Sequence, residues 1–132
     1  MDEIRNVGIA LIIDGPRVLV TQRRADDSFP LCWEFPGGTC EPDETLEVCV
    51  VREMQEELGV TVAVEAPGPD VLHRYPEWTI RLVSFWCRVT AGTPQALEAA
   101  QWRWVTADEL PQYQFPPASG PLIAAVQKRL AA

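Results

Sequence analysis

Three glutamates, Glu53, Glu56 and Glu57, lie close together in a segment that the sequence predicts to be helical. Like charges at this spacing destabilise a helix by about 0.2–0.5 kcal/mol per pair. An ideal helix turns by about 100° per residue, so the three carboxylates converge beside the apolar face that contains Met54 and Leu58. Carboxylates arranged in this way form either a solvated acidic face or a cation-binding site.

The loop before this helix favours the cation-binding alternative. Gly37-Gly38 allows backbone carbonyls to approach a ligand closely, and Glu44 stands just before the helix. Carboxylate and carbonyl oxygens suit Mg²⁺, for which Mn²⁺ can substitute. Zinc is disfavoured because the sequence has one histidine, His73, and no Cys-x-x-Cys pair. We therefore expect a magnesium site formed by the loop and the helix.

The four cysteines, Cys32, Cys40, Cys49 and Cys87, are scattered along the sequence. Their spacing resembles neither a redox motif nor a disulfide framework, so we expect free thiols that are buried or half-buried. Cys49 precedes Glu53 by one helical turn, and we interpret it as a small packing residue and not as a nucleophile.

Length and charge limit the classes of partner. A chain of 132 residues predicts one domain, 1–132, and a net charge of −8 opposes binding to duplex nucleic acid or to an anionic membrane. The sequence contains no apolar run long enough to span a membrane and begins with a polar, acidic segment. We therefore expect a cytoplasmic protein, either a monomer or a homodimer.

Periodicity and turn residues predict the elements that position these groups. We expect a helix capped by Thr45 and ended by Gly59, and a closing helix over 121–131. The expected strands span 4–13 and 17–23, which form a hairpin, and 33–35, 60–65, 71–75, 79–90 and 102–105, with a break at 66–70 and an ordered proline-rich loop over 111–121. Strands mixed with two helices predict an α/β layered domain with a central sheet.

The loop and helix together resemble the Nudix box. Gly38, five residues, Glu44, seven residues and then REMQEELGV from Arg52 agree with that motif at every specified position. The segments WEFPGG at 33–38 and FPPA at 115–118, and Glu98 followed by Trp104-Val105, are similar to the MutT branch. The resemblance implies a Nudix fold, in which a mixed β-sheet is sandwiched between helices and carries a catalytic loop-helix-loop.

The resemblance also implies the roles of the catalytic residues. Glu53, Glu56 and Glu57 would hold the metal with the Gly37 carbonyl, and Glu53 would accept a proton from water. Glu98 would be either a metal ligand or the base, although a surface acid in a loop has the same appearance in sequence. The same resemblance assigns Glu44 and Arg52 to orienting the loop against the helix.

For the substrate, the resemblance implies a nucleoside triphosphate, either canonical or oxidised or modified as in 8-oxo-dGTP. It is hydrolysed to the monophosphate and pyrophosphate in nucleotide-pool sanitation. Arg23 either contacts phosphate or pairs with Asp26 or Asp27. Candidates for base recognition are Glu34, Phe35, Gly38, Tyr75, Trp78 and Ser119.

Ser119 departs from the MutT pattern, in which Asn follows FPPA in proteins that prefer oxidised guanine. Serine has one hydroxyl, whereas asparagine offers a paired donor and acceptor. Hydrolysis of CTP, dCTP or a modified cytosine nucleotide is therefore an alternative. A catalytically silent nucleotide-binding module is a further alternative, which the intact set of box glutamates disfavours.

Overall fold

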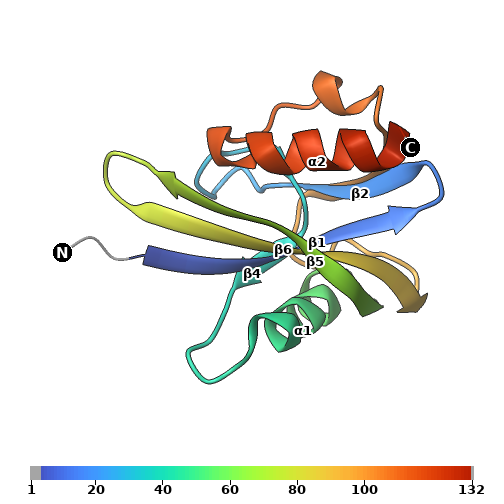
Figure 1. Cartoon of the computed structure of the whole chain (residues 1–132), viewed down its shortest axis with the longest axis horizontal. Coiled ribbons are helices and arrows are strands. Elements are labelled where there is room, and N and C mark those ends of the chain that lie inside the picture. The colour runs from blue at the N-terminus through green and yellow to red at the C-terminus, as the bar shows by residue number, and fades with distance from the viewer. Residues whose placement is uncertain (1–3, 132) are drawn as a thin grey trace.

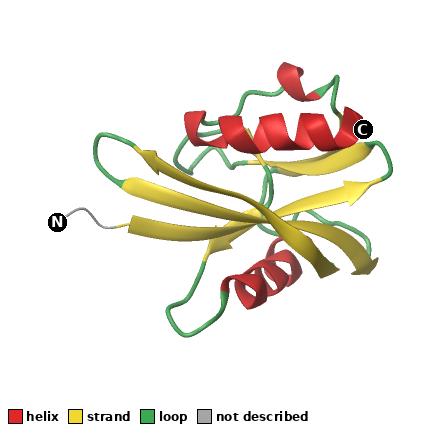
Figure 2. Cartoon of the chain, in the orientation of Figure 1, coloured by secondary structure: helices red, strands yellow, loops and turns green. Residues whose placement is uncertain are grey.

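The computed structural model describes residues 4–131 and shows a sheet with one helix packed on each side (Figure 1, Figure 2). The helices are α1 (Leu46–Leu58) and α2 (Gly120–Ala131), and two 3₁₀ turns span Leu110–Gln112 and Pro117–Ser119. The strands are β1 (Ile4–Asp14), β2 (Arg17–Gln22), β3 (Trp33–Glu34), β4 (Gly37–Thr39), β5 (Thr61–Arg74), β6 (Thr79–Ala91) and β7 (Gln101–Thr106). The expected mixed sheet between helices is confirmed.

Strand β1 is the central element of the sheet. The strands follow the order β3-β2-β1-β6-β5, β4 adds to β1, and β7 adds to β2. β1 runs parallel to β6, whereas its pairings with β2 and β4 are antiparallel. The β1–β4 pairing places Gly38 opposite Gly8, so the loop that precedes α1 begins at the end of β4, beside the central strand.

The hairpin expected over the first 23 residues is confirmed, with Ile13 opposite Val18. The strand break expected at 66–70 is wrong, because β5 runs through this segment. β5 lies at an edge of the sheet, and its register shifts between Val64 and Ala66 and between Pro67 and Asp70. Prolines are tolerated at an edge strand and at bulges because no ladder N–H is needed there.

Helix α1 begins and ends where the sequence predicts. The Thr45 hydroxyl accepts a hydrogen bond from the Val48 amide at 3.2 Å, and Gly59 adopts a left-handed conformation with φ of 68°. Val50, Met54 and Leu58 are fully buried against the sheet. This packing fixes the rotation of the helix about its axis, and therefore the direction of its glutamates.

Helix α2 covers the opposite face of the sheet. Leu122 and Val126 are buried, and Ile123 and Leu130 pack against the same cluster, as predicted. The proline-rich segment before α2 is ordered by the two 3₁₀ turns. No helix among residues 4–131 combines the length and the apolar character needed to cross a membrane.

Candidate active site

The loop approaches α1 so closely that only glycine fits there. A Cβ on Gly38 would lie 2.2 Å from Glu53 Oε2, and a Cβ on Gly37 would lie 2.1 Å from the Gly8 carbonyl oxygen. A Cβ on Gly37 would require the backbone of β1 or β4 to move, and a Cβ on Gly38 would require the Glu53 carboxylate to move. Gly37 therefore allows β4 to lie close to β1, and Gly38 allows it to lie directly against the Glu53 carboxylate of α1.

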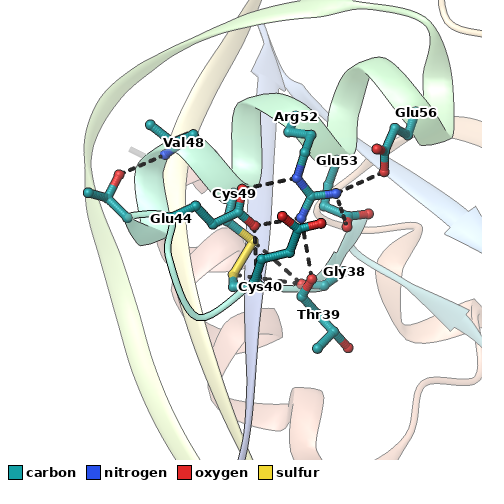
Figure 3. Close-up of polar contacts among 11 residues, drawn as sticks. Gly38, Thr39, Cys40, Glu44, Val48, Cys49, Arg52, Glu53 and Glu56 are labelled. Atoms are coloured by element: carbon teal, nitrogen blue, oxygen red, sulfur yellow. Dashed lines mark hydrogen bonds and ion pairs between the residues drawn. A yellow bond between two sulfur atoms is a disulfide. The ribbon is translucent and has the colours of Figure 1, made fainter.

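Arg52 ties the loop to the helix through several carboxylates (Figure 3). Its guanidinium contacts Glu44 at 2.6 and 3.0 Å, Glu53 at 3.0 Å and Glu56 at 2.9 Å. Glu44 also accepts a hydrogen bond from the Glu41 amide at 2.9 Å. The hydrogen bonds from Arg52 and the Glu41 amide lower the pKa of Glu44 to about 2. Glu44 and Arg52 therefore form an ion pair between the loop and the helix, with the two-point geometry typical of arginine and carboxylate, which is compatible with the orienting role that the resemblance implies.

Glu57 is a buried carboxylate with few partners. Its side chain accepts a hydrogen bond from the Gly37 amide at 3.2 Å and a long one from the Thr21 hydroxyl at 3.4 Å. Burial, reinforced by the charge of Glu34 and more weakly by those of Glu53 and Glu98, raises its pKa to about 8. Without a cation, this group therefore tends to remain protonated.

Glu98 lies in the loop before β7 and lines the same cleft as the glutamates of α1. The backbone of its loop is held to the end of α1, since the Leu97 amide donates to the Glu57 carbonyl at 3.1 Å and the Gln95 amide donates to the Leu58 carbonyl at 3.0 Å. Glu53, Glu57 and Glu98 line one cleft of about 280 Å³. Burial raises the pKa of Glu53, Arg52 opposes this effect, and Glu56 and Glu98 add to it.

Glu56 does not line this cleft. Its side chain is exposed and its carboxylate is bound by Arg52. Of the four glutamates that the resemblance suggests as metal ligands, Glu53, Glu57 and Glu98 line the cleft, and Glu56 lies outside its lining.

The lining of the cleft has the chemistry of a divalent-cation site. Its acidic lining residues are Asp27, Glu34, Glu53, Glu57 and Glu98. Carboxylate oxygens are hard ligands of the kind that Mg²⁺ and Mn²⁺ prefer. The raised pKa values of Glu53 and Glu57 show that their negative charges are incompletely compensated by the groups around them. A divalent ion would supply the missing positive charge.

A second cavity, of about 300 Å³, adjoins the acidic cleft and shares Arg23, Glu34, Gly37 and Gly38 with it. Its walls include all the residues that the sequence suggests for base recognition: Glu34, Phe35, Gly38, Tyr75, Trp78 and Ser119.

The aromatic walls differ in exposure. Phe35 is buried and packs on Phe115, whereas Tyr75 and Trp78 are half-buried with ring centroids 5.0 Å apart. The Tyr75 hydroxyl accepts a hydrogen bond from the Ala118 amide at 3.3 Å, which joins the end of β5 to the turn that carries Ser119.

Arg23 stands between the two cavities. It pairs with Glu34 and with Asp27, both at 2.8 Å, and also donates to the Ser28 carbonyl at 2.6 Å. The sequence predicts that Arg23 either contacts phosphate or pairs with Asp26 or Asp27, and the structure shows the pairing with Asp27. Arg23 also lines both cavities, so contact with a bound phosphate stays a prediction. Burial raises the pKa of Glu34, although Arg23 acts in the opposite direction.

The expectation of free thiols is wrong for one pair, since Cys40 and Cys49 form a disulfide. The loop that leaves β4 folds back over the first turn of α1, and this tertiary path has no signature in cysteine spacing. Cys32 and Cys87 are free thiols, half-buried and buried respectively, as expected. Sequence reasoning also missed Thr21 as a partner of Glu57. A glycine within a strand indicates that another segment approaches its backbone closely. Gly8 in β1 is such a glycine, and the disulfide packs against it.

Comparison with known proteins agrees with this geometry. The sequence matches the NUDIX domain family over residues 3–126. It is 33% identical over 111 residues to an 8-oxo-dGTP diphosphatase of Escherichia coli, covering 84% of this chain and 86% of the relative. It is 34% identical over 119 residues to a CTP pyrophosphohydrolase of Escherichia coli, covering 88% and 86% respectively.

Two solved structures extend the comparison to the fold. The Escherichia coli ORF135 protein superposes with a TM-score of 0.83 at 32% identity, covering 99% of this chain and 93% of that one. A MutT structure from work on Aliivibrio salmonicida and Vibrio cholerae superposes with a TM-score of 0.77 at 28% identity, covering 96% and 99% respectively.

Proposed function

Because this chain belongs to the Nudix family, we propose that it is a Mg²⁺-dependent pyrophosphohydrolase that converts a nucleoside triphosphate to the monophosphate and pyrophosphate. The observation that carries this proposal is the junction of an acidic cleft with an aromatic-walled cavity of nucleoside size. Relatives named 8-oxo-dGTP diphosphatase support an oxidised or modified nucleotide as the substrate and nucleotide-pool sanitation as the role.

The metal would be held by carboxylates from two elements. Glu53, Glu57 and Glu98 line the cleft and, with the Gly37 carbonyl, are the proposed ligands. Glu56 would join them by exchanging its contact with Arg52 for the metal. A divalent ion bound there screens phosphate charge and lowers the pKa of a coordinated water.

The side chains of this enzyme then position the reactants and move one proton. A Glu53 carboxylate oxygen accepts the proton of the attacking water, and Arg52 holds that carboxylate at 3.0 Å. Glu44 fixes Arg52 in turn through two hydrogen bonds. The reaction depends on positioning and charge more than on covalent chemistry, which suits a site made of rigidly held carboxylates.

The adjoining cavity would bind the nucleoside. Arg23 lies at the border of the two cavities, where its guanidinium can contact phosphate. Tyr75 and Trp78 pack on each other, and Arg5 lies over the Trp78 ring at 4.5 Å. The base would therefore contact the parts of these half-buried rings that remain exposed in the wall, beside the buried Phe35. Glu34 provides a carboxyl group at the border between the base and the phosphates.

A cytosine nucleotide is the second candidate substrate. One relative is named CTP pyrophosphohydrolase, and Ser119 stands in the cavity wall where an oxidised-guanine site has Asn. A serine hydroxyl reaches less far and makes fewer hydrogen bonds than an asparagine amide. The wall therefore lacks the paired donor and acceptor that favour oxidised guanine, and a cytosine base is compatible with it.

The deciding experiment compares kcat/KM for a panel of canonical and damaged nucleoside triphosphates in Mg²⁺, including 8-oxo-dGTP, dCTP, CTP and 5-methyl-dCTP. We expect release of pyrophosphate from at least one of them, with Ser119→Asn shifting preference toward 8-oxo-dGTP. Absence of hydrolysis across the panel, together with measurable nucleotide binding, would favour the silent binding module instead.

A further inference from the structure

The disulfide joins the two parts of the proposed catalytic machinery. Cys40 follows directly after β4, and Cys49 lies in α1 one turn before Glu53 (Figure 3). The segment enclosed between the two cysteines contains Glu44 and the helix cap Thr45. The crosslink therefore closes a short loop around the residues that orient the catalytic helix.

The two sulfur atoms occupy a niche formed by glycine. A Cβ at Gly8 would lie 3.1 Å from the Sγ atoms of both Cys40 and Cys49, so a larger residue on β1 would displace them. The Gly38 carbonyl oxygen lies 3.9 Å from Cys40 Sγ and 3.8 Å from Cys49 Sγ. Gly38 in turn lies against the Glu53 carboxylate. The disulfide thus packs on the backbone that positions a proposed metal ligand.

Other interactions would hold this region together without the crosslink. Arg52 binds Glu44 at two points, Thr45 caps α1, and the Cys40 amide donates to the Asn6 carbonyl at 3.1 Å. We therefore expect the reduced chain to keep its fold, while the loop between β4 and α1 gains freedom. Such a crosslink can be made and broken in the native protein.

We propose that Cys40 and Cys49 form a reversible redox modification site that controls how firmly the proposed metal ligands are held together. Cys40 is half-buried and Cys49 is fully buried, so an incoming thiol attacks Cys40 Sγ and Cys49 Sγ leaves as the thiolate. A second thiol then resolves the mixed disulfide, so that one protein disulfide and two thiols give two protein thiols and one external disulfide. Oxidation is the reverse, with a small disulfide such as oxidised glutathione as the oxidant.

In the crosslinked form the loop that positions the proposed metal ligands is already ordered before a cation binds. The disulfide holds Gly38 against α1 and so reduces the cost of ordering the loop when a cation binds. We expect the nucleotide-free crosslinked protein to bind Mn²⁺ with a Kd roughly fivefold lower than that of the reduced protein. Closing a loop of this length also raises the Tm, by on the order of 10 °C.

The test equilibrates the full chain with oxidised glutathione or with dithiothreitol, removes the reagent, and measures intact mass, Tm and Mn²⁺ affinity by electron paramagnetic resonance. Peptide mapping identifies the linked cysteines. Cys40→Ser and Cys49→Ala remove the crosslink and should make Tm and Mn²⁺ affinity insensitive to the reagents. Cys32→Ser, which removes a free thiol elsewhere, should respond as the wild type does.

These measurements need no substrate, so their outcome does not depend on whether the protein hydrolyses a nucleotide. Only the measurement of Mn²⁺ affinity rests on the proposed metal ligands. Two results would overturn the redox site. Both cysteines could remain thiols in oxidised glutathione, or the crosslink could form while Mn²⁺ affinity stays the same in both states.

Discussion

Glu57 should make the metal-free protein less stable as the pH rises. Its carboxylate is buried, its hydrogen-bond donors are the Gly37 amide and the more distant Thr21 hydroxyl, and Glu34, Glu53 and Glu98 surround it with like charge. These effects raise its pKa from an ordinary 4.5 to about 8 in the folded state. The folded chain therefore binds a proton that the unfolded chain releases between these two values.

The sign follows from proton linkage. Where the folded state holds more protons, the free energy of unfolding falls with increasing pH, by up to about 1.4 kcal/mol per pH unit. The stabilisation by protonated Glu57 is complete below pH 4.5, the pKa of this group in the unfolded chain, and is lost as the pH rises toward about 8, its pKa in the folded chain. Between pH 5.5 and 7.5, Glu57 should therefore lower the free energy of unfolding by about 2 to 3 kcal/mol.

Urea unfolding in EDTA at these two pH values, followed by tryptophan fluorescence, measures this loss. Glu57→Gln keeps the shape and a hydrogen-bond acceptor but cannot ionise, so its profile should be flatter than that of the wild type by the same amount. Glu56→Gln, which changes an exposed carboxylate on the same helix, should leave the wild-type slope intact. Parallel profiles for wild type and Glu57→Gln would refute the assignment of Glu57 as a buried, uncompensated acid.

Three further outcomes follow from the same geometry. Glu53→Gln should lower Mg²⁺-dependent kcat by at least about 100-fold with an unchanged circular dichroism spectrum, and near-normal turnover would exclude Glu53 as the proton acceptor. Gly38→Ala should also lose activity, because the new Cβ would lie 2.2 Å from the Glu53 carboxylate. The control Gly120→Ala should retain activity, because a Cβ at this position has no atom within 4 Å. Equal activity of the two variants would show that β4 need not lie against α1. Burial raises the pKa of the Cys87 thiol to about 12, so iodoacetamide at pH 8 should alkylate Cys32 and spare Cys87 in the native protein, and rapid labelling of Cys87 would contradict its burial.

Local interactions determined helix α1 and could be recognised in the sequence. Thr45 and Gly59 set its ends through hydrogen bonds to neighbouring backbone groups. The helical period then places Glu53 and Glu57 beside the buried face of Met54 and Leu58, whatever the rest of the chain does. The pairing of Glu44 with Arg52 follows from the same short segment.

Tertiary structure decided which acids share a cleft. Glu98 reaches Glu53 and Glu57 because backbone hydrogen bonds fasten its loop to the end of α1, and these join residues far apart in sequence. Glu56 remains outside the lining, where its side chain is exposed and its carboxylate is bound by Arg52. The burial of Glu57 depends on β2 and β4, whose approach no local pattern records.

The errors in the sequence analysis have the same origin. Residues 66–70 continue a strand because β5 lies at an edge of the sheet, where proline and bulges are tolerated. Cys40 and Cys49 meet because the loop returns over α1 at the place where Gly8 leaves room for sulfur. The sequence by itself determined where α1 begins and ends and which of its faces carries the proposed catalytic glutamates, since helix caps and helical period are local. The grouping of those residues, and the crosslink beside them, were decided by contacts between distant segments, which exist only once the sheet has formed.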